Sequence, residues 1–273
     1  MLSINIGLIG SGRMATALAQ GFVRAELLTP IQIIASDPSE AARRAFSSGV
    51  PGTTVVSENL PVATQSDIVL LAVKPQMMSE ALASIRNEIR PTALVVSIAA
   101  GVTLSRMAAA LPEAQRLVRV MPNTPCLIGR GASAYSLGQY ATAADGQLVA
   151  QLLSAVGTAF EVPESALDAV TGLSGSGPAF VYTMIEALAA GGVAAGLPSK
   201  LAAELATRTA VGAAEMVLQT GETPAVLRDR VTSPGGTTLA GLAVLEDRAF
   251  GDIVIAAVEA ATRRSVELGQ LSK

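Results

Sequence analysis

The chain has 273 residues, of which half are hydrophobic, and a formal net charge of −3, so it can bury a sizeable core but has no basic stripe of the kind that binds nucleic acid. Histidine is absent, which excludes a Ser-His-Asp triad, a His general base and an imidazole-built zinc site, and we predict no metal site. One cysteine, Cys126, excludes an internal disulfide and indicates a reducing compartment, the cytoplasm.

Residues 1 to about 125 alternate strand and helix signals. Apolar runs predict strands over 3–10, 31–36, 67–73, 93–99 and 116–121, with helical stretches between them. Near-continuous Val, Ile and Leu runs are typical of strands buried on both faces of a parallel sheet. The alternation therefore predicts a doubly wound α/β domain of the Rossmann type.

Two weaker strand signals follow, and the strand pattern then ends. Residues 131–138 predict an edge strand and residues 158–162 predict another strand. We place the boundary of the dinucleotide-binding domain here, with residues 1–162 in that domain and residues 163–273 in an all-helical one.

The all-helical part is predicted to contain long helices, and its first one is the most unusual. Helix signals cover 178–195, 199–219, 223–231 and 248–268. The stretch 178–196 is apolar nearly all round, with Glu186 as its only charge, so we expect it to be buried against another subunit.

No membrane attachment is expected from the sequence. The uncharged run 169–185 is interrupted by Gly, Ser and Pro and falls short of the roughly 18 apolar residues that a membrane span needs. The first residues lack the basic region and cleavage site of a signal peptide, so we interpret them as a strand.

The segment Gly-Ser-Gly-Arg-Met-Ala at 10–15 has the pattern G-x-G-x-x-A between a predicted strand and a predicted helix. Gly10 allows the tight turn, Gly12 lets a pyrophosphate approach the backbone, and Ala15 permits close packing of the helix on the strand. The helix N-terminus adds free N–H donors for the phosphates. In this context the motif predicts dinucleotide binding, whereas a glycine-rich turn without strand and helix would not.

The acidic partner of this motif is expected at the end of the second strand, where Asp37 lies. A carboxylate accepts hydrogen bonds from both ribose hydroxyls of NAD and repels a 2′-phosphate, which favours NADH. Ser36, Ser39, Arg43 and Arg44 nearby are groups that can accommodate NADP, and Asp37 also suits a helix N-cap. Both cofactors therefore remain open.

Small residues and prolines follow three further predicted strands, at 72–75, 97–101 and 121–125. Ligands bind at the carboxyl ends of strands in open α/β sheets, so these loops are candidates for the nicotinamide half of the cofactor. Lys74 is a candidate for a phosphate or a ribose, or is solvated surface. Asn123 is a candidate for the carboxamide. Cys126 is interpreted as a buried small residue, because the chain offers no base to activate it.

The second half of the chain distinguishes two kinds of oxidoreductase. Oxidation of an alcohol needs a base, commonly a helical lysine, whereas reduction of a protonated C=N bond needs mainly a hydride donor and an orienting pocket. No lysine follows 168–180 on its helix, which favours imine chemistry. The tract Ser-Pro-Gly-Gly-Thr-Thr at 233–238 would present free backbone N–H groups to a carboxylate, although alone it reads as an ordinary inter-helix turn.

Two blocks, DAVTGLSGSGPAF (168–180) and VTSPGGTTLAGL (231–242), resemble the signature blocks of the pyrroline-5-carboxylate reductase family. Further similarity lies in GLIGSGRMA (7–15), LAVKPQ (71–76), SIAAGVT (97–103), MPNTP (121–125) and GGVAAGLP (191–198). The resemblance covers essentially the whole chain in the family's order and spacing.

The resemblance implies an enzyme that reduces Δ1-pyrroline-5-carboxylate to L-proline with NAD(P)H, built from a Rossmann domain and an all-helical dimerisation domain. It implies a homodimer or a larger homo-oligomer built from dimers. The implied cofactor residues are Gly10, Ser11, Gly12, Arg13, Met14, Asp37, Asn59, Val73, Lys74 and Ala100. The implied substrate residues are Glu164, Ser233, Gly235, Gly236, Thr237 and Thr238, of which Thr238 faces the ring nitrogen and is the catalytic residue.

Two positions depart from the family pattern. Asp37 stands where members that prefer NADPH tend to carry a serine or another uncharged or basic residue, and Arg230 stands where some members have an asparagine near the cofactor. The resemblance therefore leaves NADP(H) and NAD(H) open. The alternatives to this function are another Rossmann-type imine reductase, a β-hydroxyacid dehydrogenase, and a non-catalytic NAD(P)-binding sensor.

Overall fold

The computed structural model describes residues 1–271, and these form two compact units. One unit comprises Met1–Ser176 together with the C-terminal segment from Glu259, and the other comprises Gly177–Val258. The domain boundary that the sequence predicts, between residues 162 and 163, remains a prediction.

The first unit is built on a sheet of eight strands in the order β3-β2-β1-β4-β5-β6-β7-β8. Every neighbouring pair is parallel except β6 with β7. The order of the first six is that of a doubly wound dinucleotide-binding sheet, so the predicted fold class is confirmed. The strands are β1 (Ile6–Ile9), β2 (Ile33–Ser36), β3 (Thr54–Val56), β4 (Ile68–Leu71), β5 (Leu94–Ser97), β6 (Arg116–Met121), β7 (Gly131–Leu137) and β8 (Gly157–Glu161).

Two strands differ from the expectation. The strand predicted at the edge, β7, lies inside the sheet between β6 and β8, so that prediction was wrong. It turns back antiparallel to β6, with Val118 opposite Leu137, and β8 then pairs parallel to it and forms the edge. The short strand β3 was not predicted, because three residues at the other edge of a sheet carry too little periodicity.

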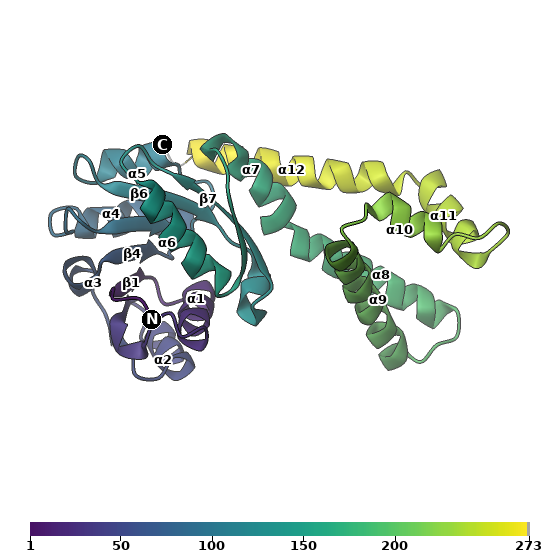
Figure 1. The fold of residues 1–273 in the computed structure, drawn as a ribbon, viewed down its shortest axis with the longest axis horizontal. Coiled ribbons are helices and arrows are strands. Elements are labelled where there is room, and N and C mark those ends of the chain that lie inside the picture. Colours follow the sequence, from purple (N-terminus) through teal and green to yellow (C-terminus); the bar gives the residue numbers. More distant parts are fainter. Residues whose placement is uncertain (272–273) are drawn as a thin grey trace. The chain divides into compact units, whose positions relative to one another are not determined.

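Helices cover both faces of this sheet (Figure 1). Side chains alternate across each strand, so Leu8 contributes to one apolar cluster and Ile9 to the other. The first cluster includes residues of α1 (Arg13–Arg24), α2 (Glu40–Gly49) and α6 (Ala143–Ser154). The second includes residues of α3 (Leu60–Gln65), α4 (Met78–Ile85) and α5 (Leu104–Ala110). Burial on both faces explains the near-continuous apolar runs.

Short helices complete the connections within this unit. Four 3₁₀ turns cover Pro30–Gln32, Pro75–Met77, Thr124–Ile128 and Glu164–Ala166. Helix α7 (Leu167–Val170) continues into one turn of π-helix over Thr171–Gly175. Such single π turns are frequent at functional sites.

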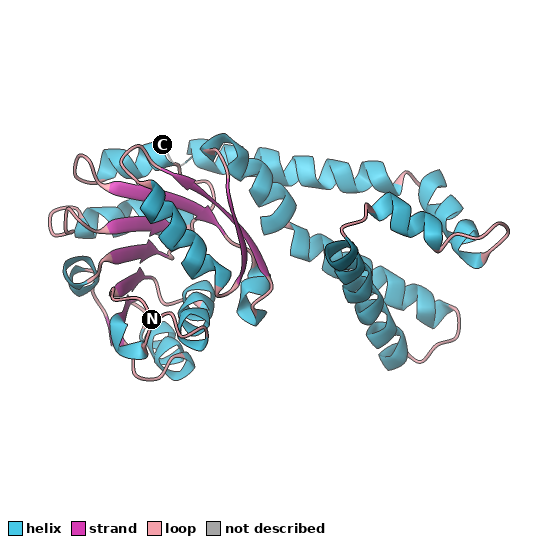
Figure 2. Cartoon of the chain, in the orientation of Figure 1, coloured by secondary structure: helices cyan, strands magenta, loops and turns pink. Residues whose placement is uncertain are grey.

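The second unit contains helices and loops (Figure 2). Its helices α8 (Gly177–Ala194), α9 (Ser199–Thr220) and α10 (Pro224–Arg230) begin and end within two residues of their predicted positions. Helix α11 (Thr237–Asp247) follows the 233–238 turn, and the last helix, α12 (Phe250–Leu271), extends beyond the predicted 268. Helix α8 pairs with α9, yet Tyr182 and Leu188 on α8 are 57% and 50% exposed. The apolar surface of α8 is therefore not covered within its own unit.

The helical run Glu164–Ala194 spans 31 residues, and an 18-residue window within it has a mean hydropathy of 1.2, so by length and composition alone it is able to cross a membrane. The expected interruption by Gly, Ser and Pro takes the form of the π turn and a bend at Ser176, between α7 and α8. The π turn accommodates Gly172 and Gly175, and Pro178 lies in the first turn of α8, where its missing N–H removes no helical hydrogen bond.

Candidate active site

The glycine-rich loop joins β1 to α1 at the carboxyl edge of the sheet. Gly10 has φ +95°, and a Cβ placed on it would lie 2.7 Å from the carbonyl oxygen of Ala72, so this position requires glycine. Gly12 is the N-cap of α1, and a Cβ on it would have no heavy atom within 4 Å. The approach to the helix N-terminus is therefore open.

The loop also fits a dinucleotide by its polar atoms. The hydroxyl of Ser11 is buried without a hydrogen-bond partner among the described residues. A buried hydroxyl without a partner is costly, and a phosphate oxygen at this helix N-terminus would satisfy it. Arg13 and Met14 form the first turn of α1, next to this opening.

Asp37 follows β2 directly, and its carboxylate is anchored on both oxygens. Its Oδ2 accepts the backbone N–H of Ser11 at 3.0 Å, and its Oδ1 accepts that of Ser39 at 2.9 Å. Arg43 donates from its guanidinium to the carbonyl oxygens of Asp37 and Pro38, at 2.7 and 2.9 Å. Arg44 pairs instead with Glu40 on the same helix. The charge next to the glycine-rich loop is thus a fixed carboxylate.

The other predicted cofactor residues lie at the ends of neighbouring elements. Asn59 is the N-cap residue of α3; its Oδ1 accepts the Ser36 hydroxyl at 2.7 Å, and its Nδ2 donates to Ser84 at 2.9 Å. Val73 and the exposed Lys74 follow β4, and the half-buried Ala100 follows β5. The structure thus brings the ten predicted cofactor residues to the carboxyl edge of the parallel strands, where open α/β sheets bind ligands.

A charged cluster is centred on Arg119 of β6, and of its members the sequence reasoning identified only Glu164. The guanidinium of Arg119, on β6, is 3.2 Å from Glu164 Oε1 and 3.3 Å from Asp168 Oδ1. Ser265 of α12 donates to Asp168 at 2.7 Å. A signal was present, because an arginine inside an apolar strand buried on both faces needs a carboxylate partner.

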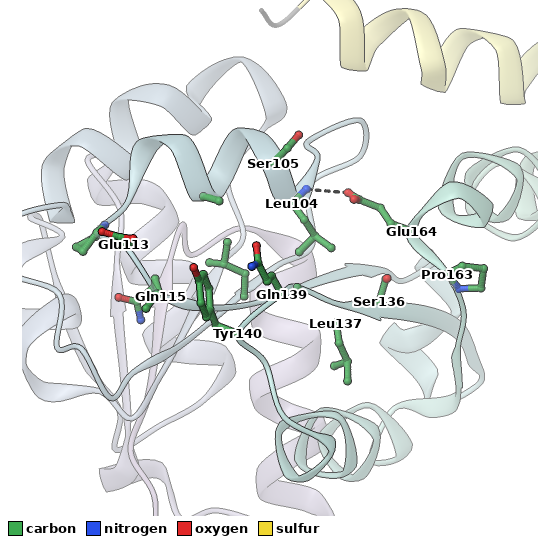
Figure 3. A pocket seen from close by; sticks show the side chains of 15 residues that line it. Leu104, Ser105, Glu113, Gln115, Ser136, Leu137, Gln139, Tyr140, Pro163 and Glu164 are labelled. Atoms are coloured by element: carbon green, nitrogen blue, oxygen red, sulfur yellow. Dashed lines mark hydrogen bonds between the residues drawn. The ribbon is translucent and has the colours of Figure 1, made fainter.

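Glu164 also borders a hollow of about 690 Å³ in the same unit. Figure 3 shows its carboxylate bonded to the backbone N–H of Leu104, at 2.7 Å, at one end of this hollow. The lining includes Ser105, Gln115, Ser136, Gln139 and Tyr140.

Two residues of the 121–126 segment have structural partners. The side-chain amide of Asn123 donates to Ser174 and accepts the N–H of Ala132 at 2.9 Å, so it holds the π turn against β7 and is not free to bind a carboxamide. Cys126 is fully buried, and burial raises the pKa of its thiol. It is therefore a packing residue, as predicted, because a reactive cysteine needs an exposed, stabilised thiolate.

The predicted substrate residues other than Glu164 lie in the second unit, in the turn between α10 and α11. Gly235 has φ +70°, and Gly236 is the N-cap of α11 with its N–H bonded to the carbonyl of Ser233 at 2.9 Å. Thr237 and Thr238 begin the helix, so their N–H groups belong to the first turn, where helices leave amide donors without helical partners. The turn has the form of an anion site.

A doubly wound sheet with an open glycine-rich loop, an anchored aspartate after the second strand and a helical second part defines an NAD(P)-dependent oxidoreductase. Comparison with known proteins specifies the class. Residues 164–268 match the model described as pyrroline-5-carboxylate reductase dimerisation, and residues 5–101 match the one described as NADP oxidoreductase coenzyme F420-dependent. The chain belongs to the pyrroline-5-carboxylate reductase family.

The similarity extends over the whole chain. A pyrroline-5-carboxylate reductase of Methanosarcina acetivorans is 47% identical, over 97% of this chain and 98% of the relative, and one of Arabidopsis thaliana is 46% identical, over 98% and 96%. A crystal structure of the Plasmodium falciparum pyrroline carboxylate reductase with NADP bound has a TM-score of 0.89 at 33% identity, covering 98% of this chain and 99% of that one.

Proposed function

We propose that the chain reduces Δ1-pyrroline-5-carboxylate to L-proline, the last step of proline synthesis, with a hydride from NADPH or NADH. The observation that carries the proposal is the full-length similarity to enzymes of that name, at up to 47% identity. The open approach at Gly12 and the unpartnered Ser11 hydroxyl support cofactor binding at the first unit.

NAD(P)H, when bound, supplies the hydride for C5 of the pyrroline ring. The protein binds the cofactor and the substrate and orients them for hydride transfer. The glycine-rich loop and the N-terminus of α1 would bind the pyrophosphate, and Asp37 would bind the adenosine ribose. The remaining cofactor contacts in this proposal come from Asn59, Val73, Lys74 and Ala100. Because the protonated imine accepts hydride directly, no histidine is needed.

In this proposal the 233–238 turn binds the substrate, and Glu164 is a further substrate residue, as the family resemblance implies. Backbone N–H groups of Gly235 and Thr237 bind the carboxylate, as helix N-termini bind anions, and the Ser233 hydroxyl assists them. Gly236, whose own N–H is bonded to Ser233, lets the substrate come close. Thr238 bonds the ring nitrogen. Fixation of the carboxylate and exclusion of water lower the barrier to hydride transfer.

A spectrophotometric assay tests the function directly. NAD(P)H absorbance is followed with pyrroline-5-carboxylate, with a β-hydroxyacid plus oxidised cofactor, and with cofactor alone. Consumption with the cyclic imine supports the reductase. Tight cofactor binding with no turnover on either substrate class would instead support a non-catalytic sensor, and turnover on the hydroxyacid would support a dehydrogenase.

Thr238→Ala is expected to lower kcat about 10- to 100-fold, equivalent to about 1.4–2.8 kcal/mol of barrier, because the ring nitrogen loses its hydrogen-bond partner. Thr238→Ser, which keeps the hydroxyl, is the matched control and should stay within a few-fold of wild type. Steady-state kinetics with both variants measure this. Unchanged kinetics of Thr238→Ala would remove this residue from the mechanism.

The matched dimerisation model and the reductase relatives support a homo-oligomer that acts on a small molecule. We propose a dimer, or a larger assembly of dimers, in which a second copy covers the apolar surface of α8. We further propose a soluble cytoplasmic enzyme without nucleic-acid or membrane partners, in which the run Glu164–Ala194 serves association rather than membrane insertion.

Ala190→Glu is expected to shift the protein toward monomer, because a carboxylate on the exposed apolar surface of α8 would be buried without a partner in the interface. Ala144→Glu, at an exposed position in the first turn of α6, adds the same charge away from α8 and is the control. Sedimentation velocity measures both. A wild-type profile for Ala190→Glu would contradict the placement of the interface.

A further inference from the structure

Arg119 is a buried cation whose role is not explained by the fold alone. Its side chain is only 4% exposed, in the central part of the sheet on β6. An ion in such a position is costly unless its partners are well placed, and Arg119 has two, the carboxylates of Glu164 and Asp168. Both carboxylates follow β8, at the start of the segment that leads to the long helices.

The two carboxylates are used differently. Asp168 Oδ1 accepts from both Arg119 and Ser265, which ties α12 to the sheet. Glu164 Oε1 accepts from Arg119 and from the N–H of Leu104, which opens α5 after the loop of β5. No donor among residues 1–271 bonds Glu164 Oε2, and this side chain is 32% exposed. Oε1 of Glu164 is thus held by two hydrogen bonds, whereas Oε2 is available to a ligand.

The formal charges of this cluster do not cancel, and negative charge is in excess. One guanidinium faces two carboxylates, so the cluster carries a net charge of −1. It lies beside the β5–α5 loop, since Arg119 is opposite Ser97 at the end of β5 and Glu164 bonds Leu104 at the start of α5. This is the edge of the sheet at which open α/β sheets bind ligands. A negative charge here favours the cationic iminium form of a cyclic imine over the neutral imine, and the iminium is the form that accepts hydride.

We propose that Arg119 is a positioning residue for the substrate: it locks Glu164 Oε1 so that the free oxygen presents a fixed negative charge to the cationic ring nitrogen. This inference rests on the proposed function. Arg119 itself does not touch the substrate. Its effect should therefore appear in recognition of the ring charge and not in cofactor binding.

The test compares Arg119→Met with Arg119→Lys and with Arg116→Met. Arg116 lies on the same strand and pairs with Asp145 at 2.7 Å, outside the candidate site, so Arg116→Met removes a comparable ion pair as a control. In Arg119→Met the Michaelis constant for pyrroline-5-carboxylate should rise about 10- to 100-fold, with that for NAD(P)H within about twofold. Arg119→Lys should recover part of the loss, and Arg116→Met should resemble wild type.

A binding measurement without turnover separates positioning from general disruption. L-Proline carries a cationic ring nitrogen, whereas tetrahydrofuran-2-carboxylate has a ring oxygen in its place. Calorimetry should show L-proline binding weakened about tenfold or more in Arg119→Met, with little change for the ring-oxygen compound. Should Arg119→Met not fold, Arg119→Met with Asp168→Asn restores the charge balance of the buried cluster and is measured instead.

The outcomes distinguish this inference from the function itself. A folded Arg119 variant with wild-type constants for pyrroline-5-carboxylate and L-proline overturns the inference while the reductase stands. Equal losses for both ring compounds and for the cofactor also overturn it, because they indicate a structural role. A wild-type chain that does not turn over pyrroline-5-carboxylate overturns the proposed function and the inference together.

Discussion

Gly12→Val is expected to weaken NAD(P)H binding about 100-fold or more, equivalent to about 2.8 kcal/mol, while the protein stays folded. A Cβ on Gly12 meets no atom within 4 Å, and its φ of −74° and ψ of −175° are open to any residue. The new side chain would fill the space that a pyrophosphate needs at the N-terminus of α1. Fluorescence titration with the reduced cofactor measures the loss.

Gly10→Ala is the contrasting control on the same loop. Gly10 has φ +95°, and its added Cβ would lie 2.7 Å from the Ala72 carbonyl oxygen, so this change strains the backbone. We expect Gly10→Ala to lower the melting temperature, whereas Gly12→Val should leave it within a few degrees of wild type. Normal cofactor affinity in a folded Gly12→Val protein would show that the dinucleotide does not bind at this loop.

Asp37→Ser is expected to shift the ratio of kcat/KM for NADPH over NADH about 100-fold toward NADPH. The carboxylate is anchored next to the loop, so it can accept ribose hydroxyls but would lie against a 2′-phosphate. Arg43 is engaged with backbone carbonyls and does not neutralise it. The prediction concerns the change in preference and holds whichever cofactor the wild type prefers.

The control for Asp37 is another carboxylate that accepts a backbone N–H. Asp67 accepts the N–H of Asn5 at 2.7 Å and pairs with Arg90, and it precedes β4 at the opposite edge of the sheet. Asp67→Ser should lower stability without changing the cofactor ratio. If Asp37→Ser and Asp67→Ser leave the same ratio of kcat/KM values, Asp37 has no part in cofactor selection.

Local sequence patterns were sufficient for most of the fold. Apolar runs identified seven of the eight strands in chain order, with weaker signals for β7 and β8. The burial of the sheet on both faces follows from those runs. Tertiary pairing decided the rest. A strand's neighbours are not encoded in its own residues, so the interior place of β7 and the pairing of the short β3 emerged only in the assembled sheet.

The candidate site also has a part that the sequence predicts and a part that only the structure shows. The glycine-rich loop, Asp37 and the 233–238 turn are recognisable in the sequence, because turns and helix N-termini require particular residues at consecutive positions. The cluster of Arg119, Glu164, Asp168 and Ser265 is not recognisable, because its members lie up to 146 positions apart (265 − 119) and meet only through the sheet and the last helix.

By itself the sequence determined the doubly wound fold, the dinucleotide loop and the family, since each depends on local spacing or on overall similarity. Only the tertiary structure decided which buried charges face each other, which glycine is open to a ligand and which is confined, and which asparagine is committed to the backbone. These properties depend on distances between segments remote in the chain, and folding sets those distances.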